Sequence, residues 1–256
     1  MTSALETPIL KSAEAAHGDW SVLPAWAPVG DLGAIPINAF VLKGPEPVLV
    51  DTGVGAFGDA FVAGLESVVD PAALRWIWLS HMDWDHIGNL TRVLERAPNA
   101  TVITNFLGVA KLGLVNIQLP RVHLMQPGES IDIAGRKLTA MRPVYYDAPE
   151  TMGFYDETDR ALFSADSFGA VLPGPIDRLS DVDERTLAGG MTNWSAIDAP
   201  WLGDHDVAAL RRKLAAVEAL EPRAVLSAHL PVAHNFTRQL TGIVANAYAN
   251  GVRQAA

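Results

Sequence analysis

A short segment of this sequence carries four side chains that can bind metal ions. Residues 81–86 read His-Met-Asp-Trp-Asp-His and directly follow the apolar run 75–80. Imidazole and carboxylate are the side-chain metal ligands that remain in a chain without cysteine. A lone His or Asp is most often a solvated or helix-capping residue. Two imidazoles and two carboxylates at the end of a buried strand instead predict a metal site.

The spacing within this segment indicates how the ligands are arranged. Alternate side chains of an extended chain point the same way, so His81, Asp83 and Asp85 share one side. His86 then turns inward where the next helix begins. Four converging ligands are more than one metal normally takes from a single segment, which suggests two metal ions. In the simpler interpretation, the segment is a solvated loop in which Asp85 caps the helix.

The surrounding pattern predicts a mixed α/β protein, with residues 1–256 forming a single domain. Strands are expected at short apolar or β-rich runs, which are 38–43, 47–53, 75–80, 100–105, 131–135, 137–144, 152–157, 161–166 and 223–229. The first two of these runs are joined as a hairpin. Helices are expected at amphipathic stretches, which are 57–69, 87–98, 204–221 with Asp204 as its N-cap, and a last one within 235–253. We expect residues 1–20 to be an irregular extension and residues 170–200 to be a long connection with irregular helix.

Composition and charge narrow the classes of partner. The chain has 256 residues, 49% of them hydrophobic, and a formal net charge of −10. Nucleic acid is excluded as an expected partner because phosphate backbones need a basic face. The absence of cysteine excludes disulfides, thiolate zinc sites and a cysteine nucleophile. No signal-peptide core or membrane-span-length segment is seen, so we expect a cytoplasmic protein with no membrane partner.

Residues 79–90 resemble the metal-binding signature of the metallo-β-lactamase superfamily, which usually reads His-x-His-x-Asp-His. Three other segments are similar to this superfamily. In them, Asp51 would support the site without binding metal, Asp166 would bridge two metals, and His229 would be the last ligand. The resemblance covers most of the chain. It implies a four-layer αββα sandwich, two mixed β-sheets flanked by helices, with a dinuclear site at one edge.

A carboxylate at position 83 selects a branch of this superfamily. Asp83 resembles the flavodiiron proteins and the related oxygen-binding diiron proteins, in which this residue is usually Glu. Residues 146–169 are also more similar to flavodiiron sequences than to hydrolases. The branch has a His ligand where this chain has Asp147. The chain therefore differs from the hydrolases at Asp83 and from both groups at Asp147.

The resemblance implies a ligand set for two divalent metal ions. One ion would be held by His81, Asp83 and Asp147, the other by Asp85, His86 and His229, and Asp166 would bridge them. Four carboxylates balance the charge of two divalent ions. Such an oxygen-rich site favours iron, with manganese and zinc as the alternatives, because carboxylate suits the harder cations.

Two positions in this set have competing assignments. Asp147 can instead be a turn residue before Pro149, since Asp favours turns. In that case Tyr145 or Tyr146 faces the metal, and these tyrosines together with Asp85 are the residues predicted to act in catalysis. His234 competes with His229, although it fits a loop or a helix cap better.

Several other residues have a simpler expected role. His17, His123 and His205 lie in no motif and are expected to be surface or structural residues. Trp84 and Phe168 are expected to pack around the site, or to form an apolar wall that limits the access of water. The glycines expected to allow close backbone approach near the metals are Gly53 and Gly88.

The favoured function is redox chemistry. Two irons would bind or reduce O2, NO or peroxide, sense such a gas, or oxidise a small-molecule substrate, while the protein supplies orientation and a dry cavity. The flavodiiron relatives carry a flavodoxin domain as electron donor, for which this chain has no room. The resemblance therefore implies a separate electron-donor protein, and also a homodimer.

Hydrolysis is the alternative function. Water activated by the two metals would attack an ester, lactone, thioester or phosphodiester. Asp83 in place of His disfavours this reading, and seven metal-competent residues disfavour a third one, a scaffold that has lost its chemistry. Residues 107–130 and 170–203 are expected to border the pocket. Residues 106–120 are expected to form a core helix, the alternatives being a pocket wall, a lid or a subunit contact.

Overall fold

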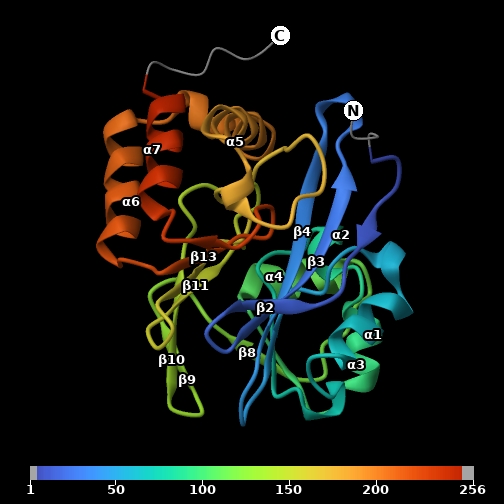
Figure 1. Ribbon diagram of the computed structural model, residues 1–256. Coiled ribbons are helices and arrows are strands. Elements are labelled where there is room, and N and C mark those ends of the chain that lie inside the picture. Colours follow the sequence, from blue (N-terminus) through green and yellow to red (C-terminus); the bar gives the residue numbers. More distant parts are fainter. Residues whose placement is uncertain (1–4, 250–256) are drawn as a thin grey trace.

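Two β-sheets lie face to face, and helices cover the outer face of each sheet in the computed structural model, which describes residues 5–249 (Figure 1). The predicted four-layer αββα sandwich is confirmed. Nothing in this arrangement tests the extent of the domain, so a single domain over 1–256 stays a prediction.

The first sheet is built from the N-terminal half of the chain. Its strands are β1 (Ile9–Leu10), β2 (Glu14–His17), β3 (Trp20–Pro28), β4 (Ala34–Leu42), β5 (Val48–Val50), β6 (Trp76–Trp78), β7 (Thr101–Thr104) and β8 (Val122–Leu124). Their order is β1-β3-β4-β5-β6-β7-β8, with β2 also paired to β3. Strands β4 and β5 pair antiparallel, which confirms the expected hairpin, and β5 to β8 run parallel.

The second sheet follows from residue 130 onward. Its strands are β9 (Ser130–Ile133), β10 (Arg136–Met141), β11 (Gly153–Asp156), β12 (Ala161–Phe163), β13 (Ala224–Leu226) and β14 (Ala233–His234). Their order is β14-β13-β12-β11-β10-β9. All neighbouring pairs are antiparallel except β12 and β13, which run parallel.

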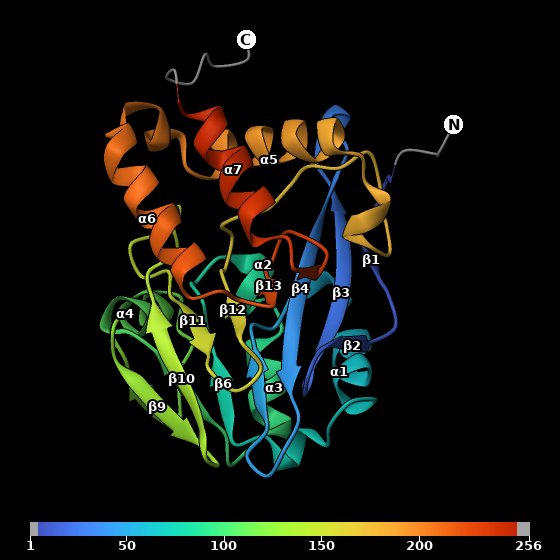
Figure 2. The ribbon, with the colours of Figure 1, turned by 60° about the vertical axis from the view of Figure 1, so that its left-hand side comes forward.

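The helices divide between the two outer faces. The first set comes from residues 59–114 and comprises α1 (Asp59–Glu66), α2 (Trp84–Ile87), α3 (Leu90–Arg96) and α4 (Phe106–Leu114). Side chains of α1, α3 and α4 pack against the first sheet. The second set comprises α5 (Glu184–Asp198), α6 (Val207–Ala219) and α7 (Thr237–Ala247), which cover the second sheet (Figure 2).

Alternation of side chains along the strands produces three apolar layers. In β5, Val48 and Val50 face the space between the sheets, whereas Leu49 faces the helices outside the first sheet. In β12, Phe163 faces the space between the sheets and Leu162 faces the second set of helices. Successive strand residues point to opposite faces, so each central strand contributes side chains to two apolar layers.

The structure corrects four predictions about elements. Residues 9–20 are not irregular, because they form β1, β2 and the start of β3, while residues 1–4 lie outside the described range. Residues 170–200 contain the regular fifteen-residue helix α5. Helix α6 begins after Asp206, whose side chain accepts a hydrogen bond from Ala208 N, so Asp204 is not its N-cap. Within the expected helix 87–98, only Leu90–Arg96 forms a helix, α3, and Ile87 is the last residue of the separate short helix α2.

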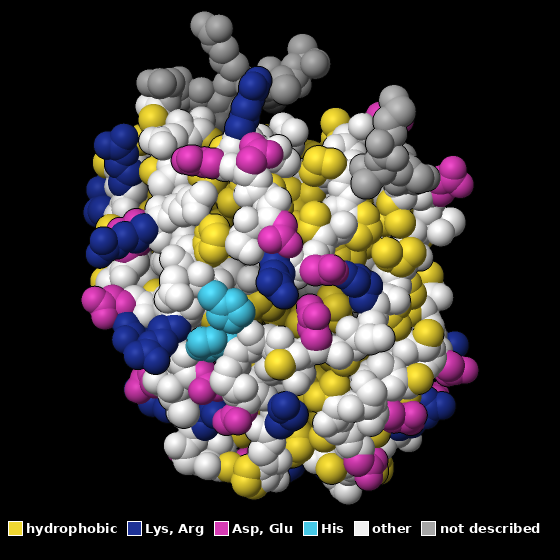
Figure 3. Space-filling model, viewed as in Figure 1, with side chains coloured by type: hydrophobic (Ala, Val, Ile, Leu, Met, Phe, Trp, Pro, Cys, Tyr) yellow, Lys and Arg dark blue, Asp and Glu magenta, His cyan; other side chains and the backbone are white. Residues whose placement is uncertain are grey.

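The outer surface carries charges of both signs. On the face shown in Figure 3, acidic side chains are interspersed with basic ones. Among residues 5–249, none of the helices combines the length and apolar character needed to cross a membrane.

Candidate metal centre

The predicted ligands all lie just beyond the carboxyl end of a strand. Strands β5 and β6 run parallel in the first sheet, as β12 and β13 do in the second. The segments that follow β6, β10, β12 and β13 carry the seven residues His81, Asp83, Asp85, His86, Asp147, Asp166 and His229. Because parallel strands end at the same edge of a sheet, residues far apart in the sequence meet there.

Three imidazoles converge on Asp166. Its Oδ1 lies 3.3 Å from His86 Nε2 and 3.3 Å from His229 Nε2, and its Oδ2 lies 3.4 Å from His81 Nε2. The four side chains are buried, and Asp166 is only 4% exposed. The aspartate that the resemblance assigns as a bridge therefore lies at the centre of the histidines.

The opposite ring nitrogen of each histidine is fixed by a neighbour. His229 Nδ1 lies 2.8 Å from the carbonyl oxygen of Pro36, and His81 Nδ1 lies 3.1 Å from Ser80 Oγ. When Nδ1 carries the proton and bonds outward, Nε2 keeps its lone pair and faces the site. The hydrogen bonds of the protein itself thus orient these imidazoles as metal ligands.

Asp51 supports His86 in the same way. Its Oδ2 accepts hydrogen bonds from His86 Nδ1 at 2.9 Å and from Ser80 Oγ at 2.7 Å, and its Oδ1 accepts from Ser80 N at 2.8 Å. Asp51 has a left-handed backbone, with φ of 57°. This conformation is uncommon for a residue with a side chain, and it is held here by the three hydrogen bonds. The predicted supporting position of Asp51 agrees with this geometry.

The loop around Asp166 is also held in an uncommon conformation. Ala165 and Phe168 both have positive φ, 48° and 68°. Trp194 Nε1 donates a hydrogen bond to the backbone oxygen of Asp166 at 3.0 Å, and its ring lies 4.5 Å from the ring of His229. Strained backbone of this kind persists where its surroundings determine it, which is typical of functional sites.

The two predicted ligand groups are each brought together. Asp85, His86 and His229 present ligand atoms within 4.8 Å of one another, and so do His81, Asp83 and Asp147. His86 belongs also to a third group with His81 and Asp166, which joins the first two. Asp85 Oδ2 lies 3.5 Å from both His86 Nε2 and His229 Nε2. The geometry matches two metal positions that share Asp166.

Orphaned polar atoms test whether these residues suit a cation. Within residues 5–249, neither His86 Nε2 nor Asp166 Oδ1 has a hydrogen-bond partner, although both atoms are buried. Such atoms are rare in folded proteins and call for an occupant. A buried acceptor nitrogen opposite a buried carboxylate oxygen suits a metal ion, so the residues fit the dinuclear centre.

The carboxylates of the site have shifted pKa values because of burial and because they lie close to imidazoles and to one another. Burial alone would raise the pKa of Asp166, but the three surrounding imidazoles hold that pKa well below its usual range. Burial raises the pKa of Asp83, and burial together with Asp166 raises the pKa of Asp147. Divalent cations would remove this repulsion between neighbouring carboxylates.

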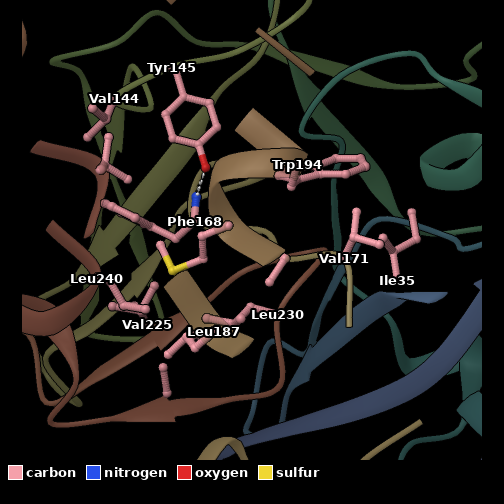
Figure 4. Close-up of a cluster of buried hydrophobic side chains, with 14 of the residues drawn as sticks. Ile35, Val144, Tyr145, Phe168, Val171, Leu187, Trp194, Val225, Leu230 and Leu240 are labelled. Carbon is pink, nitrogen blue, oxygen red and sulfur yellow. Dashed lines mark hydrogen bonds between the residues drawn. The ribbon is translucent and has the colours of Figure 1, made fainter. Parts of the chain in front are cut away.

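Tyr145 and Tyr146 contact other aromatic or apolar residues, whereas Asp147 lies beside His81. Tyr145 is fully buried, and its hydroxyl accepts a hydrogen bond from Phe168 N at 2.6 Å within an apolar cluster (Figure 4). The ring of Tyr146 lies 5.6 Å from that of Trp201. Asp147 Oδ1 lies 3.9 Å from His81 Nε2. The structure therefore brings Asp147 beside His81, as expected for this ligand group, and its role as a ligand stays a prediction.

Some predicted neighbours of the site lie elsewhere. His234 is in β14, not in a loop or helix cap, and its Nε2 bonds to the carbonyl oxygen of Ala16 at 2.9 Å. Phe168 is buried as expected, but Trp84 is 66% exposed and so does not pack around the site. Gly88 does allow close approach, since a Cβ there would lie 2.2 Å from Gly55 N.

Helix α4 exposes apolar surface, so residues 106–120 are not simply a core helix. Phe106 is 68% exposed and Leu114 is 84% exposed, whereas Leu112 is buried. Lys111 forms an ion pair with the buried Glu150, which ties α4 to the loop that carries Asp147. One groove, of about 660 Å³, contains none of the predicted metal ligands in its lining, which includes residues 176–180.

Sequence reasoning missed two residues on α5. Trp194 bonds to Asp166 as described above, and Asp198 places a carboxylate oxygen within 4.8 Å of ligand atoms of Asp147 and Asp166. Burial, with Asp166 and Asp147 beside it, raises the pKa of Asp198 to about 8. The available signal was the spacing of Leu187, Met191, Trp194 and Asp198, which places them on one face of a helix.

Replacement of Asp147 tests its position in the ligand set. If Asp147 binds one of two ions, Asp147→Ala should lower the metal content from about two ions per chain to about one. Elemental analysis of the purified variant measures this. The exposed Asp31→Ala variant should keep the wild-type content. Full occupancy of Asp147→Ala would show that Asp147 is a turn residue only.

Comparison with known proteins identifies the same family that the sequence resembles. A family model described as "ODP family beta lactamase" matches residues 35–229. The chain is 31% identical over 135 residues to Flavo-diiron protein FprA2 of Clostridium acetobutylicum, covering 52% of this chain and 34% of that protein. It is 29% identical over 134 residues to the anaerobic nitric oxide reductase flavorubredoxin of Enterobacter, covering 52% of this chain and 28% of that protein.

A solved structure shares the fold. Rubredoxin oxygen:oxidoreductase from Desulfovibrio gigas superposes with a TM-score of 0.79 at 18% identity, over 93% of this chain and 61% of that chain. The matched region spans about a third of the length of the two curated relatives named above. The family model nevertheless matches more than half of this chain. The chain therefore belongs to the ODP family of beta-lactamase-fold proteins.

Proposed function

We propose that this chain is a non-haem diiron protein that binds O2, NO or peroxide and reduces it. The observation that carries the proposal is the ligand set, in which three imidazoles converge on the buried Asp166 and three further carboxylates lie beside these imidazoles. Carboxylate-rich sites favour iron or manganese, whereas softer ligand sets suit zinc.

The protein contributes position and shielding. Two bound irons would supply electrons and a binding position for a diatomic gas. His81, His86 and His229 are held by hydrogen bonds to their Nδ1 atoms, so they need no reorganisation when metal binds. Trp194 bonds to Asp166 and lies beside His229 on the buried side of the site, whereas Asp83 and Asp147 are exposed. A small gas would enter from that exposed side.

The names of the relatives support this choice of chemistry. One relative is called a nitric oxide reductase, and one structural neighbour is called an oxygen oxidoreductase. The family match to residues 35–229 contains every ligand segment, from His81 to His229. The comparisons favour reduction of a gas over the hydrolytic alternative.

The electron donor would contact the chain near Trp84. Trp84 lies between Asp83 and Asp85 in the sequence and is 66% exposed. Exposed aromatic residues are enriched in protein interfaces, so this position suits contact with a donor close to the metals. A homodimer, implied by the family resemblance, stays a prediction.

Asp83 should set the metal preference. Asp83→His replaces a hard oxygen ligand by imidazole, so the variant should bind zinc relative to iron more strongly than the wild type does. Both proteins are produced with equal iron, manganese and zinc, and their metal contents are compared. An unchanged ratio of iron to zinc would mean that Asp83 does not determine metal choice.

Reaction with gases tests the proposed function directly. The iron-loaded protein is reduced without oxygen and mixed rapidly with O2 or NO while its visible spectrum is recorded. We expect reoxidation with consumption of the gas. A protein that leaves both gases unconsumed, yet hydrolyses members of an ester and lactone panel, would be a metallohydrolase instead.

A further inference from the structure

Asp198 occupies an unusual place at the end of α5. Leu187, Met191 and Trp194 form the buried face of this helix, and Asp198 follows on the same face, four residues after Trp194. Trp194 donates its hydrogen bond to the backbone of Asp166. The helix is therefore docked on the metal centre, and its last residue is directed toward the same loop.

The carboxyl group of Asp198 faces two predicted ligands. Oxygens of Asp147, Asp166 and Asp198 all lie within 4.8 Å of one another. Among the described residues, the buried Oδ2 of Asp198 has no hydrogen-bond partner, and neither has Oδ1 of Asp166, which is only 4% exposed. Within that same range, no Lys or Arg forms an ion pair with any of these three aspartates.

This arrangement opposes ordinary electrostatics. A helix C-terminus carries partial negative charge, so a carboxylate is disfavoured there. Two more carboxylates close by add repulsion between like charges. A buried oxygen without a donor adds the loss of its hydration. A cation between the three oxygens would remove all three penalties at once.

We propose that Asp198 is a further metal ligand, which binds the ion on the Asp147 side of the centre. This inference rests on the dinuclear site of the proposed function and adds a residue to it. The ion beside His81 would then be held by one imidazole and by oxygens of Asp83, Asp147, Asp166 and Asp198. A ligand from α5 also compensates for the Asp that stands at position 147, where the family pattern has His.

The added ligand changes the charge of the centre. Five carboxylates outnumber the four positive charges of two divalent ions. The excess negative charge favours a trivalent ion on the Asp147 side, and its oxygen-rich environment selects iron or manganese over zinc. Asp198 thus determines metal choice together with Asp83.

Manganese binding tests the role of Asp198. Metal-free wild type and Asp198→Asn are titrated with Mn²⁺ under argon, and the free ion is measured by electron paramagnetic resonance. We expect two ions per wild-type chain. In Asp198→Asn the affinity for one ion should fall about tenfold or more, while the other changes little. Asn keeps the size of the side chain and removes its charge.

Two further variants complete the test. Glu184→Gln removes one exposed charge from the opposite end of the same helix and should leave both affinities within about twofold of wild type. Asp198→Ser carries the same test if the Asn variant does not fold. Unchanged affinity for both ions in a folded Asp198 variant would overturn the proposal and make Asp198 a structural acid.

The outcome for Asp198 is separate from the outcome for the proposed function. Loss of one affinity in the variant establishes the ligand even if the wild type proves inert toward O2 and NO. Gas consumption by a folded Asp198 variant with wild-type manganese affinity would keep the proposed function and reject the ligand.

Discussion

Asp166→Asn should lower the metal content of this protein from about two ions per chain to nearly none. Asp166 is the only residue among the described ones to which all three imidazoles point, with Nε2 distances of 3.3 to 3.4 Å. An amide cannot bridge two cations as a carboxylate does. Since loss of a supporting residue alone costs about 10–100-fold in metal affinity, loss of the shared ligand should cost more than about 100-fold.

The measurement is elemental analysis of the purified variant, with circular dichroism to establish that it is folded. Asp59→Asn is the matched control, because it makes the same substitution at a side chain that is 83% exposed. It should retain both ions. Two ions in a folded Asp166→Asn protein would exclude the bridging role.

Phe154→Ala should produce the largest loss of stability. Phe154 is fully buried between the sheets, where its ring lies 4.9 Å from Trp78, 5.2 Å from Phe163 and 5.3 Å from Trp20. Truncation of such a side chain leaves a cavity and typically costs about 3–5 kcal/mol. Native proteins are stable by only about 5–15 kcal/mol in total, so this is a substantial fraction.

Unfolding in urea measures the change in the free energy of unfolding. Phe106→Ala is the control, because the same substitution is made at a side chain that is 68% exposed. It should change stability by less than about 0.5 kcal/mol. Equal stability of the two variants would mean that the sheets are not packed through Phe154.

Much of the site could be predicted because its residues are clustered in the sequence. His81, Asp83, Asp85 and His86 lie within six consecutive positions, and the structure brings each of them within 4.8 Å of other predicted ligand atoms. Asp166 and His229 come from other segments, and it was their resemblance to family segments that identified them. The position of Asp147 beside His81 agrees with the prediction, whereas its role as a ligand stays a prediction.

The misses have identifiable physical causes. Residues 20–28 form a long strand, but Pro24 and Pro28 within it are residues that normally interrupt a sheet. Helix α5 contains Gly189 and Gly190 and follows a segment rich in Pro and Gly, which hides its helical spacing. Because α5 was not expected, neither Trp194 nor Asp198 could be placed at the metal centre.

The strands β9 to β12 of the second sheet were predicted more accurately than helix α5, because burial of one face leaves a clear pattern in the sequence. The ranges 131–135, 137–144, 152–157 and 161–166 were each expected to form a strand, and each overlaps one of the strands β9 to β12. Alternation of apolar and polar residues, as in β9 and β10, depends only on which face is buried. Helix and strand identity follow from such local pattern, whereas contacts across the site depend on tertiary packing.

We propose above all that this centre holds two irons. The most direct test is the identity and number of metal ions per chain, measured by elemental analysis of protein from cells supplied with equal iron, manganese and zinc. Two irons, with a visible spectrum that changes on reduction and again on exposure to O2, is the predicted result. Two zinc ions, with no spectral response to either treatment, would contradict it.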